Sequence, residues 1–246
     1  MADTRFVKNF APKKDPGPFP WFSMVFPFAF SSFVAVAEGR VGPVSFYTFA
    51  LFTALVLIPH YLGIDPKKKA GDKGENDLIA SLNSQLGNGY SLINNVRIPY
   101  KRSKTGEREI DIIVVGEKKV FIIEVKSFSG TLTSDNVMDK SWSLERKRGR
   151  GRVSVRNPVR QAFGQMLALR SQLDRYKLSV PIESAVFMNG DAVDLRLGKT
   201  TDVPIFTSVS ALSRWVESED TGRGMPKERD RVIDRIIQVD HARSSF

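Results

Sequence analysis

The sequence predicts an α/β domain in which helices flank a mixed β-sheet, preceded by a hydrophobic helical hairpin. Two apolar stretches, residues 19–37 and 44–64, carry almost no charge. From Asp65 onward the composition becomes mixed and rich in charged residues. In that second part, helical and strand-like spacings of apolar residues follow one another in the order helix, several strands, helix, strand, strand and two helices. This order is typical of an α/β sandwich around a mixed sheet.

The two apolar stretches have the length of membrane-spanning helices. Residues 19–37 contain no charged residue, and His60 is the only Asp, Glu, Lys, Arg or His within 44–64. As helices they would be about 28 Å and 31 Å long, against a bilayer core of about 30 Å. We therefore expect a two-helix transmembrane hairpin at 19–64, after an N-terminal basic segment at 1–18. A basic linker at 65–73 and an α/β domain at 74–246 follow.

Basic residues predict the orientation of this hairpin. Four precede it, four follow it closely, and the polar link between the two helices carries Arg40 alone. Both termini and the α/β domain should therefore face the cytoplasm. Two alternatives remain: a buried hydrophobic hairpin of a soluble protein, and a signal peptide cleaved after "AVA" at 35–37.

Periodicity predicts the elements of the α/β part in turn. Leu78, Ile79, Leu82 and Leu86 form one helical stripe, with Asp72 as a plausible N-cap. Strands are expected at 90–99, in two segments joined by "GEKK" at 116–119, and after Gly130. Asn157 and Pro158 should start a helix running to about Tyr176. Two short buried strands, "SAVFMNG" and "VPIFTS", precede helices near 209–218 and 226–242.

Composition excludes several kinds of chemistry. The chain has no cysteine, which rules out disulfides, thiolate zinc sites and cysteine nucleophiles. Its two histidines, His60 and His241, both lie outside the apolar strand segments, so a Ser-His-Asp triad is not expected. The net charge of +10 favours a polyanionic partner or an anionic membrane surface.

Three charges in the apolar stretch "EIDIIVVGEKKVFIIEVKS" indicate a site. If Val115 pairs with Val120 across the turn, Asp111 lies opposite Glu124, and Lys126 shares the face of Glu124. Opposed carboxylates repel unless a cation neutralises them, and carboxylate oxygens suit Mg²⁺ or Mn²⁺. The alternative is a solvated ladder in which Glu109 and Lys126 form an ordinary surface pair.

The same stretch resembles the Asp–x(n)–Glu-x-Lys core of the PD-(D/E)xK nuclease superfamily, and more narrowly the nuclease-related domain (NERD) family. "KGENDLIASL" resembles the first helix of that family, "GYSLINNVRIP" its first strand and "NPVRQAFGQMLAL" its later helix. The resemblance covers about residues 70–175. Ile110 stands where the superfamily name has proline. The resemblance implies a restriction-endonuclease-like fold and a metal-dependent nuclease.

Roles for individual residues follow from the resemblance. Asp111 and Glu124 would bind the cation with the Val125 carbonyl as a third ligand. Lys126 would orient or help deprotonate the attacking water and stabilise transition-state charge. Glu75 would complete the site, unless it forms a capping box with Asp72. Gln161 would point at the site, unless it is an ordinary polar residue of a first helical turn.

A basic segment beside this core is expected to bind nucleic acid. Residues 146–160 contain two glycines and no acid, which favours a flexible loop that contacts phosphates without reading sequence. A solvated charge run or binding to anionic lipid are the alternatives. Trp142 is more typical of a core residue than of a base-stacking one. The basic residues are Arg146, Lys147, Arg148, Arg150, Arg152, Arg156 and Arg160.

The leading hypothesis from the sequence is a membrane-anchored, Mg²⁺- or Mn²⁺-dependent nuclease that hydrolyses phosphodiester bonds. Its expected partners are nucleic acid, DNA before RNA, and membrane lipid through residues 19–64. Two other classes remain open: a membrane-tethered nucleic-acid-binding module with weak or no cleavage, and a lipid-facing scaffold. The paired Asp111 and Glu124 favour the nuclease, because a binding module has no need of a metal pair.

Overall fold

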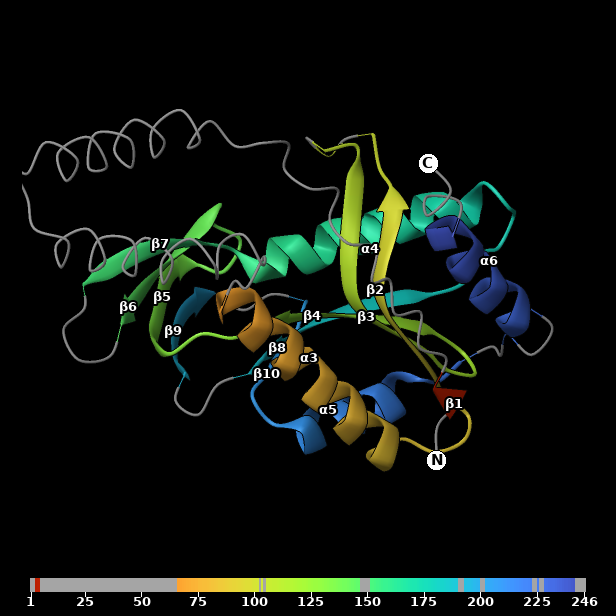
Figure 1. Ribbon diagram of the computed structural model, residues 1–246, viewed down its shortest axis with the longest axis horizontal. Coiled ribbons are helices and arrows are strands. Elements are labelled where there is room, and N and C mark those ends of the chain that lie inside the picture. The colour runs from red at the N-terminus through yellow and green to blue at the C-terminus, as the bar shows by residue number, and fades with distance from the viewer. Residues whose placement is uncertain are drawn as a thin grey trace, which may run out of the picture. The chain divides into compact units, whose positions relative to one another are not determined.

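The structure is a computed structural model of the 246-residue chain (Figure 1). It describes residues 3–4, 66–101, 103, 105–146, 151–189, 193–199, 202–222, 225 and 228–241. The hairpin expected at 19–64, and all of the segment expected at 1–18 except residues 3–4, lie outside the described residues. Of the helices inside these ranges, none has the length and apolar character required to cross a membrane.

The main sheet has six strands in the order β1-β2-β3-β4-β8-β10. β2, β3 and β4 form an antiparallel meander. β1, β8 and β10 join in parallel, which makes the sheet mixed, as the sequence predicts. The strands are β1 Asp3–Thr4, β2 Ser91–Pro99, β3 Glu107–Val115, β4 Val120–Lys126, β8 Ile182–Met188 and β10 Ile205–Phe206.

A second, four-stranded sheet forms one end of the domain (Figure 1). Its order is β7-β6-β5-β9, with β5 and β9 parallel and the other pairs antiparallel. Only β5 was expected from the sequence. The strands are β5 Gly130–Asn136, β6 Ser141–Arg146, β7 Arg152–Arg156 and β9 Val193–Lys199.

This second sheet corrects the expected basic loop at 146–160. Arg146 ends β6, Arg152–Arg156 form β7, and Pro158 already begins a helix. The strands form because Val153 and Val155 alternate with polar residues and pair across the ladder with Leu144 and Trp142. These apolar side chains pack in one buried or half-buried cluster.

Trp142 is a core residue of that cluster, as expected. Its side chain is 1% exposed, and its indole N–H donates to the carbonyl of Val137 at 3.1 Å. A buried indole that has its hydrogen-bond partner fits a structural role.

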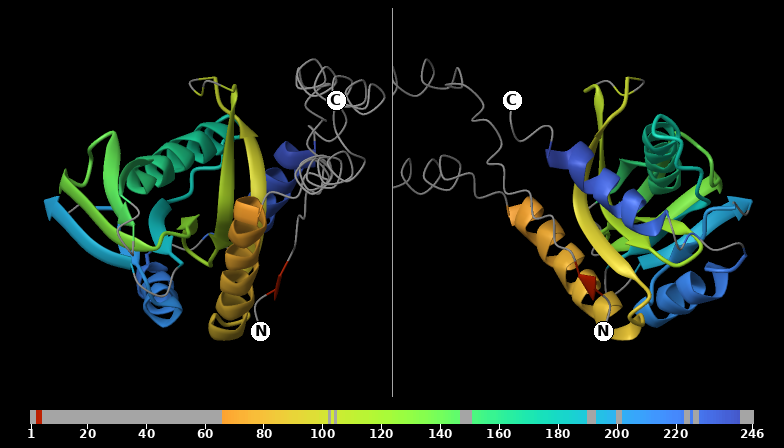
Figure 2. Two further views of the ribbon diagram at one scale, coloured as in Figure 1. Left: turned by 60° about the vertical axis from the view of Figure 1, so that its left-hand side comes forward. Right: turned by 90° about the vertical axis from the view of Figure 1, so that its right-hand side faces the viewer.

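Helices cover both faces of the main sheet (Figure 2). On one face, α4 (Pro158–Asp174) and α6 (Arg229–His241) bury residues such as Leu169 and Ile233 against the strands. On the other face, α3 (Pro66–Gln85) and α5 (Val209–Glu219) do the same with Leu82 and Leu212. The two faces alternate along each strand, so Ile122 contacts the α4 side and Ile123 the α3 side.

α3 begins earlier than predicted. It starts at Pro66, so the expected basic linker at 65–73 is helical from residue 66, and Asp72 lies inside the helix instead of capping it. Proline suits the first helical position, and the lysines and alanine that follow are good helix formers. The capping box proposed between Asp72 and Glu75 is therefore excluded as the start of this helix.

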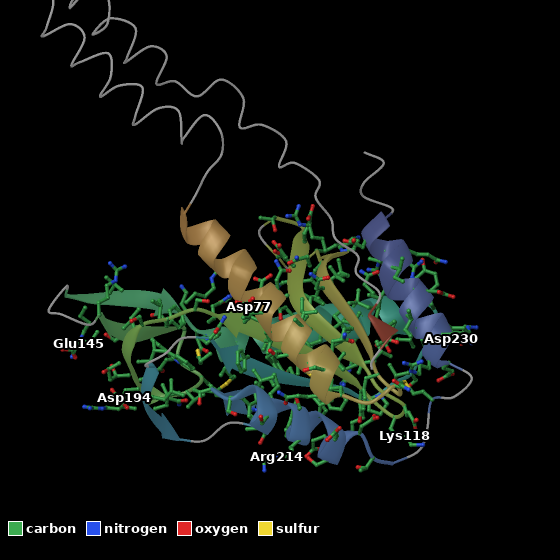
Figure 3. All side chains as sticks on the ribbon, turned by 60° about the horizontal axis from the view of Figure 1, so that its bottom comes forward. Asp77, Lys118, Glu145, Asp194, Arg214 and Asp230 are labelled. Atoms are coloured by element: carbon green, nitrogen blue, oxygen red, sulfur yellow. The ribbon has the colours of Figure 1, made fainter. Side chains whose placement is uncertain are left out.

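Asp220, which follows α5, stabilises the turn between β3 and β4. The carboxylate of Asp220 accepts the backbone N–H groups of Glu117, Lys118 and Lys119 at 2.8–2.9 Å. Figure 3 shows Lys118 at the end of the domain where Asp230 also lies, far from Glu145 and Asp194 in the second sheet. Burial, followed by the charge of Asp220, raises the pKa of Tyr90 to about 12.

Candidate active site

The expected register of the β3–β4 hairpin is confirmed. The structure pairs Val115 with Val120 and continues to Ile112 with Ile123. The β3–β4 ladder ends there, one step before Asp111 and Glu124. Beyond this point β3 remains paired with β2 as far as Glu107, whereas β4 remains paired with β8 as far as Lys126. The sheet therefore forks between β3 and β4 where the three predicted charges lie.

Asp111 bridges the fork. Its Oδ2 accepts the backbone N–H of Val125 at 2.8 Å, so a side chain occupies the place of the next ladder bond. Burial and then the charges of Glu124 and Glu75 raise the pKa of Asp111 well above its ordinary value, against the lowering effects of Lys126 and of the Val125 N–H. Three carboxylates, those of Asp111, Glu124 and Glu75, thus lie near the single ammonium of Lys126.

Glu124 is the most buried charge of the site, with a side chain only 1% exposed. Both carboxylate oxygens have a partner. Oε1 forms an ion pair with the ammonium of Lys126, and Oε2 accepts the amide N–H of Gln165. The alternative surface pair between Glu109 and Lys126 is not formed: Lys126 pairs with Glu124, and Oε1 of Glu109 lies 3.8 Å from Nη2 of Arg97 in the neighbouring strand.

Lys126 is held as a cation. Its side chain is 27% exposed. Burial alone would lower the pKa of Lys126, but the charges of Glu124, Asp111 and Glu75 outweigh burial and raise that pKa above its ordinary value. An ammonium in this position can attract and stabilise negative charge, whereas it is a poor proton acceptor.

Glu75 approaches from the opposite side of the sheet. It lies on the α3 face that buries Leu78 and Leu82, and its charge acts on both Asp111 and Lys126. A side chain at Gly74 would collide with Asn189, so the glycine lets α3 lie close to the end of β8. Glu75 is therefore near the fork, as expected.

α4 contributes two glutamines, of which the sequence predicted one. The helix is fixed at its start by Asn157, whose Oδ1 accepts the N–H groups of Val159 and Arg160. Gln161 follows in the first turn, and its Oε1 is buried without a hydrogen-bond partner in the described part of the chain. Gln165, one turn later, was missed, although it donates to Glu124 and to the carbonyl of Glu109 at 2.8 Å.

These residues line one cavity of about 660 Å³. Its wall contains Asp111, Glu124, Lys126, Gln161 and Gln165. The surrounding cations come from three further parts of the chain: β3, the turn after β5, and the segment from β7 into α4. They are Arg108, Lys140, Arg156 and Arg160.

Of the basic residues predicted from the sequence, Arg156 and Arg160 line this cavity. Arg146 and Arg152 are exposed at the ends of β6 and β7, away from its lining. Lys147, Arg148 and Arg150 lie outside the described residues. Arg108 and Lys140 were not predicted. Arg108 is separated from Asp111 by only two residues of β3, which could have drawn attention to it.

The donor set fits a divalent cation. Asp111 and Glu124 offer oxygen ligands, which Mg²⁺ and Mn²⁺ prefer. Burial, followed by the charge of Glu124, raises the pKa of Asp111, and a bound cation would favour its charged form. Among the described residues, no group of three acidic, histidine or cysteine side chains is placed to hold a metal. Two carboxylates and a backbone carbonyl, such as that of Val125, would therefore be the protein ligands.

Comparison with known proteins supports the resemblance seen in the sequence. The family model described as NERD, nuclease-related domain, matches residues 70–189. This range runs from α3 to the end of β8 and includes Glu75, Asp111, Glu124, Lys126 and Gln161. Comparisons with curated proteins and with solved structures found no match. Residues 70–189 of this chain thus match the nuclease-related domain (NERD) family, in agreement with the resemblance carried by its sequence motifs.

Proposed function

We propose that this protein is a membrane-anchored nuclease that uses Mg²⁺ or Mn²⁺ to hydrolyse phosphodiester bonds of nucleic acid. The family supports a nuclease-related function. The observation that carries the proposal is the cluster of buried Glu124 with half-buried Asp111 and Lys126 at the fork of the sheet, in a cavity bordered by arginines and lysines. Such a cavity can receive a phosphodiester and offers both acidic and basic groups to it.

Asp111 and Glu124 would hold the cation, with the Val125 carbonyl. The ion would supply Lewis-acid polarisation of the phosphate and a lower pKa for the attacking water. Lys126, kept protonated by its carboxylate neighbours, would stabilise the negative charge that develops on the phosphate oxygens as water adds and the P–O bond breaks. The raised pKa of Lys126 argues against its acting as the base that takes the proton of the water.

Gln165 and Gln161 have different proposed roles. Gln165 fixes Glu124 through its amide N–H and is a positioning residue. Gln161 lines the cavity with an unpartnered Oε1, which could accept a hydrogen bond from the attacking water. Arg156, Arg160 and Lys140 would bind backbone phosphates without reading sequence.

One observation favours the alternative, a nucleic-acid-binding module with weak or no cleavage. Lys126 forms an ion pair with Oε1 of Glu124 and Gln165 donates to Oε2, so each oxygen of this carboxylate already has a neighbour within the protein. A cleavage assay separates the two functions. The purified full chain is incubated with single- and double-stranded DNA and RNA, with Mg²⁺, with Mn²⁺ and with EDTA. Cleavage that requires either cation supports the nuclease; binding without cleavage in any condition supports the alternative.

Membrane anchoring through residues 19–64 is part of the proposal and has a separate test. Eight basic residues flank this region and one lies within it, so both termini should be cytoplasmic. Protease added outside sealed right-side-out vesicles should leave residues 65–246 intact. Digestion of that part, or a mature N-terminus at Glu38, would contradict the proposed topology.

A further inference from the structure

Arg108 is a cavity-lining arginine without an acidic partner. It lies in β3, three positions before Asp111, and its side chain reaches the same cavity as the carboxylates. Its Nε is buried and has no hydrogen-bond acceptor among the described residues. It also forms no ion pair there, although the acids Glu107 and Glu109 flank it in sequence. A half-buried guanidinium whose Nε lacks an acceptor is costly unless a ligand supplies one.

Two neighbours hold this guanidinium in position. Its Cζ lies 5.7 Å from the centroid of the Tyr100 ring. On the α4 side it lies over Gly164, where an added Cβ would come within 3.2 Å of both Cζ and Nη2 of Arg108. Gly164 sits in the middle of α4, where glycine costs roughly 1 kcal/mol relative to alanine. The absence of a side chain thus gives room to the guanidinium at the expense of helix stability.

The other acids near the cavity are already engaged. Glu124 is paired with Lys126, Asp111 accepts the N–H of Val125, and Glu109 lies beside Arg97. Glu107, the fourth acid of the cavity lining, also has an interaction partner. The group that Arg108 lacks must therefore come from outside the described part of the chain. A planar guanidinium with several N–H donors matches the oxygens of a phosphate, which it can bind through two hydrogen bonds at once.

We propose that Arg108 binds a backbone phosphate of the nucleic acid, next to the phosphodiester bond that is cut. This inference rests on the proposed function and names a contact that the sequence did not predict. Three residues of a strand span about 10 Å, so Arg108 would contact a phosphate neighbouring the one held at Asp111. This contact would fix the position of the nucleic-acid strand in the cavity without reading its sequence.

Equilibrium binding tests this contact without requiring cleavage. A fluorescent single-stranded oligonucleotide is titrated with the full chain in EDTA, and its anisotropy is measured for wild type, Arg108→Ala, Arg108→Lys and Arg170→Ala. Arg170 is an exposed arginine of α4 outside the cavity. Arg170→Ala is therefore the control, because it removes the same positive charge as Arg108→Ala without changing the cavity. Arg108→Ala should weaken binding roughly 10-fold or more, as expected for a charged hydrogen-bonding group, and Arg170→Ala by about twofold or less. Arg108→Lys should lie between the two.

Gly164→Ala separates a binding role from a structural one. It should raise the melting temperature, because alanine favours the helix, and yet weaken binding, because its methyl group displaces the guanidinium. A purely structural Arg108 would lower stability and binding together.

The proposal is overturned if Arg108→Ala binds like Arg170→Ala, if Gly164→Ala binds like wild type, or if wild type does not bind the oligonucleotide. Failure of wild type to cleave with any cation would refute the proposed nuclease and would leave this binding result standing.

Discussion

Replacing Asp111 by asparagine should stabilise the metal-free protein at neutral pH. Asp111 is half-buried beside Glu124 and near Glu75, and its partial burial and both charges raise its pKa. In the wild type, Oδ2 of Asp111 accepts the Val125 N–H at 2.8 Å. Asparagine has the same shape and keeps an oxygen that can accept this N–H, but it carries no charge. The substitution therefore relieves repulsion without leaving that backbone group unpaired.

The sign of the pH dependence follows from the raised pKa. Between the unfolded value, near 3.8, and the higher folded value, the folded protein holds a proton that the unfolded chain has lost. Wild-type stability should therefore fall as pH rises through this window, by up to about 1.4 kcal/mol per pH unit. Below this pH window Asp111 causes no loss of stability, and above the window the loss stays constant with pH. Asp111→Asn should remove this component, so its advantage over wild type grows with pH.

Urea unfolding at several pH values in EDTA measures this effect. Glu109→Gln is the matched control, because it removes one carboxylate from the same strand at a side chain that is 56% exposed. It should change the free energy of unfolding by about 0.5 kcal/mol or less. Equal pH profiles for wild type and Asp111→Asn, or a less stable Asp111→Asn at neutral pH, would refute the buried, repelling carboxylate pair.

Further substitutions test the framework of the site and the basic segment beside it. Asn157→Ala should cost about 2 kcal/mol or more in urea unfolding, because it removes the cap of α4 and the bonds to the carbonyls of Val137 and Asp139. Ser208→Ala, at a helix start without a side-chain cap bond, should cost far less; equal costs would contradict the role of Asn157. Asp220→Ala should cost about 1–3 kcal/mol and lower the pKa of Tyr90 toward 10 in an absorbance titration, and an unchanged Tyr90 would contradict their contact. Finally, replacing the five basic residues around the β6–β7 connection by alanine should make the slope of log K against log salt shallower by about 0.9 for each lost contact to duplex phosphate; an unchanged slope would exclude this segment from the interface. Those residues are Arg146, Lys147, Arg148, Arg150 and Arg152.

Local patterns in the sequence were sufficient for five of the six strands of the main sheet; β1, Asp3–Thr4, was not expected. The short turn at 116–119 and the apolar alternation around it determine the β3–β4 register, because a slip by one residue would expose a buried face. The second sheet was missed although "SWSLER", "RVSVR" and "VDLRLGK" alternate apolar and polar residues. The arginines and glycines between them favoured a loop, and pairing with distant strands supplied the burial that made them strands.

The candidate site was predictable in its charges and less so in their surroundings. Asp111, Glu124 and Lys126 could be identified because they interrupt an apolar hairpin. The fork could not, since it depends on β3 remaining with β2 and β4 with β8, which are pairings set by the whole sheet. Gln165 had a signal, as a polar residue within the buried stripe of α4, but its partner Glu124 is 41 residues away in the sequence.

Calorimetric titration of Mg²⁺ and Mn²⁺ into wild type, Asp111→Asn and Lys126→Ala, with cleavage measured on the same samples, tests the central proposal most directly. Asp111→Asn should lose both cation binding and cleavage. Lys126→Ala should bind the cation at least as tightly as wild type, because its ammonium no longer occupies Oε1 of Glu124, while cleavage falls by about 10²-fold or more. Undiminished cation binding by Asp111→Asn, or no cation binding by wild type, would contradict a metal-dependent nuclease site at the fork of β3 and β4.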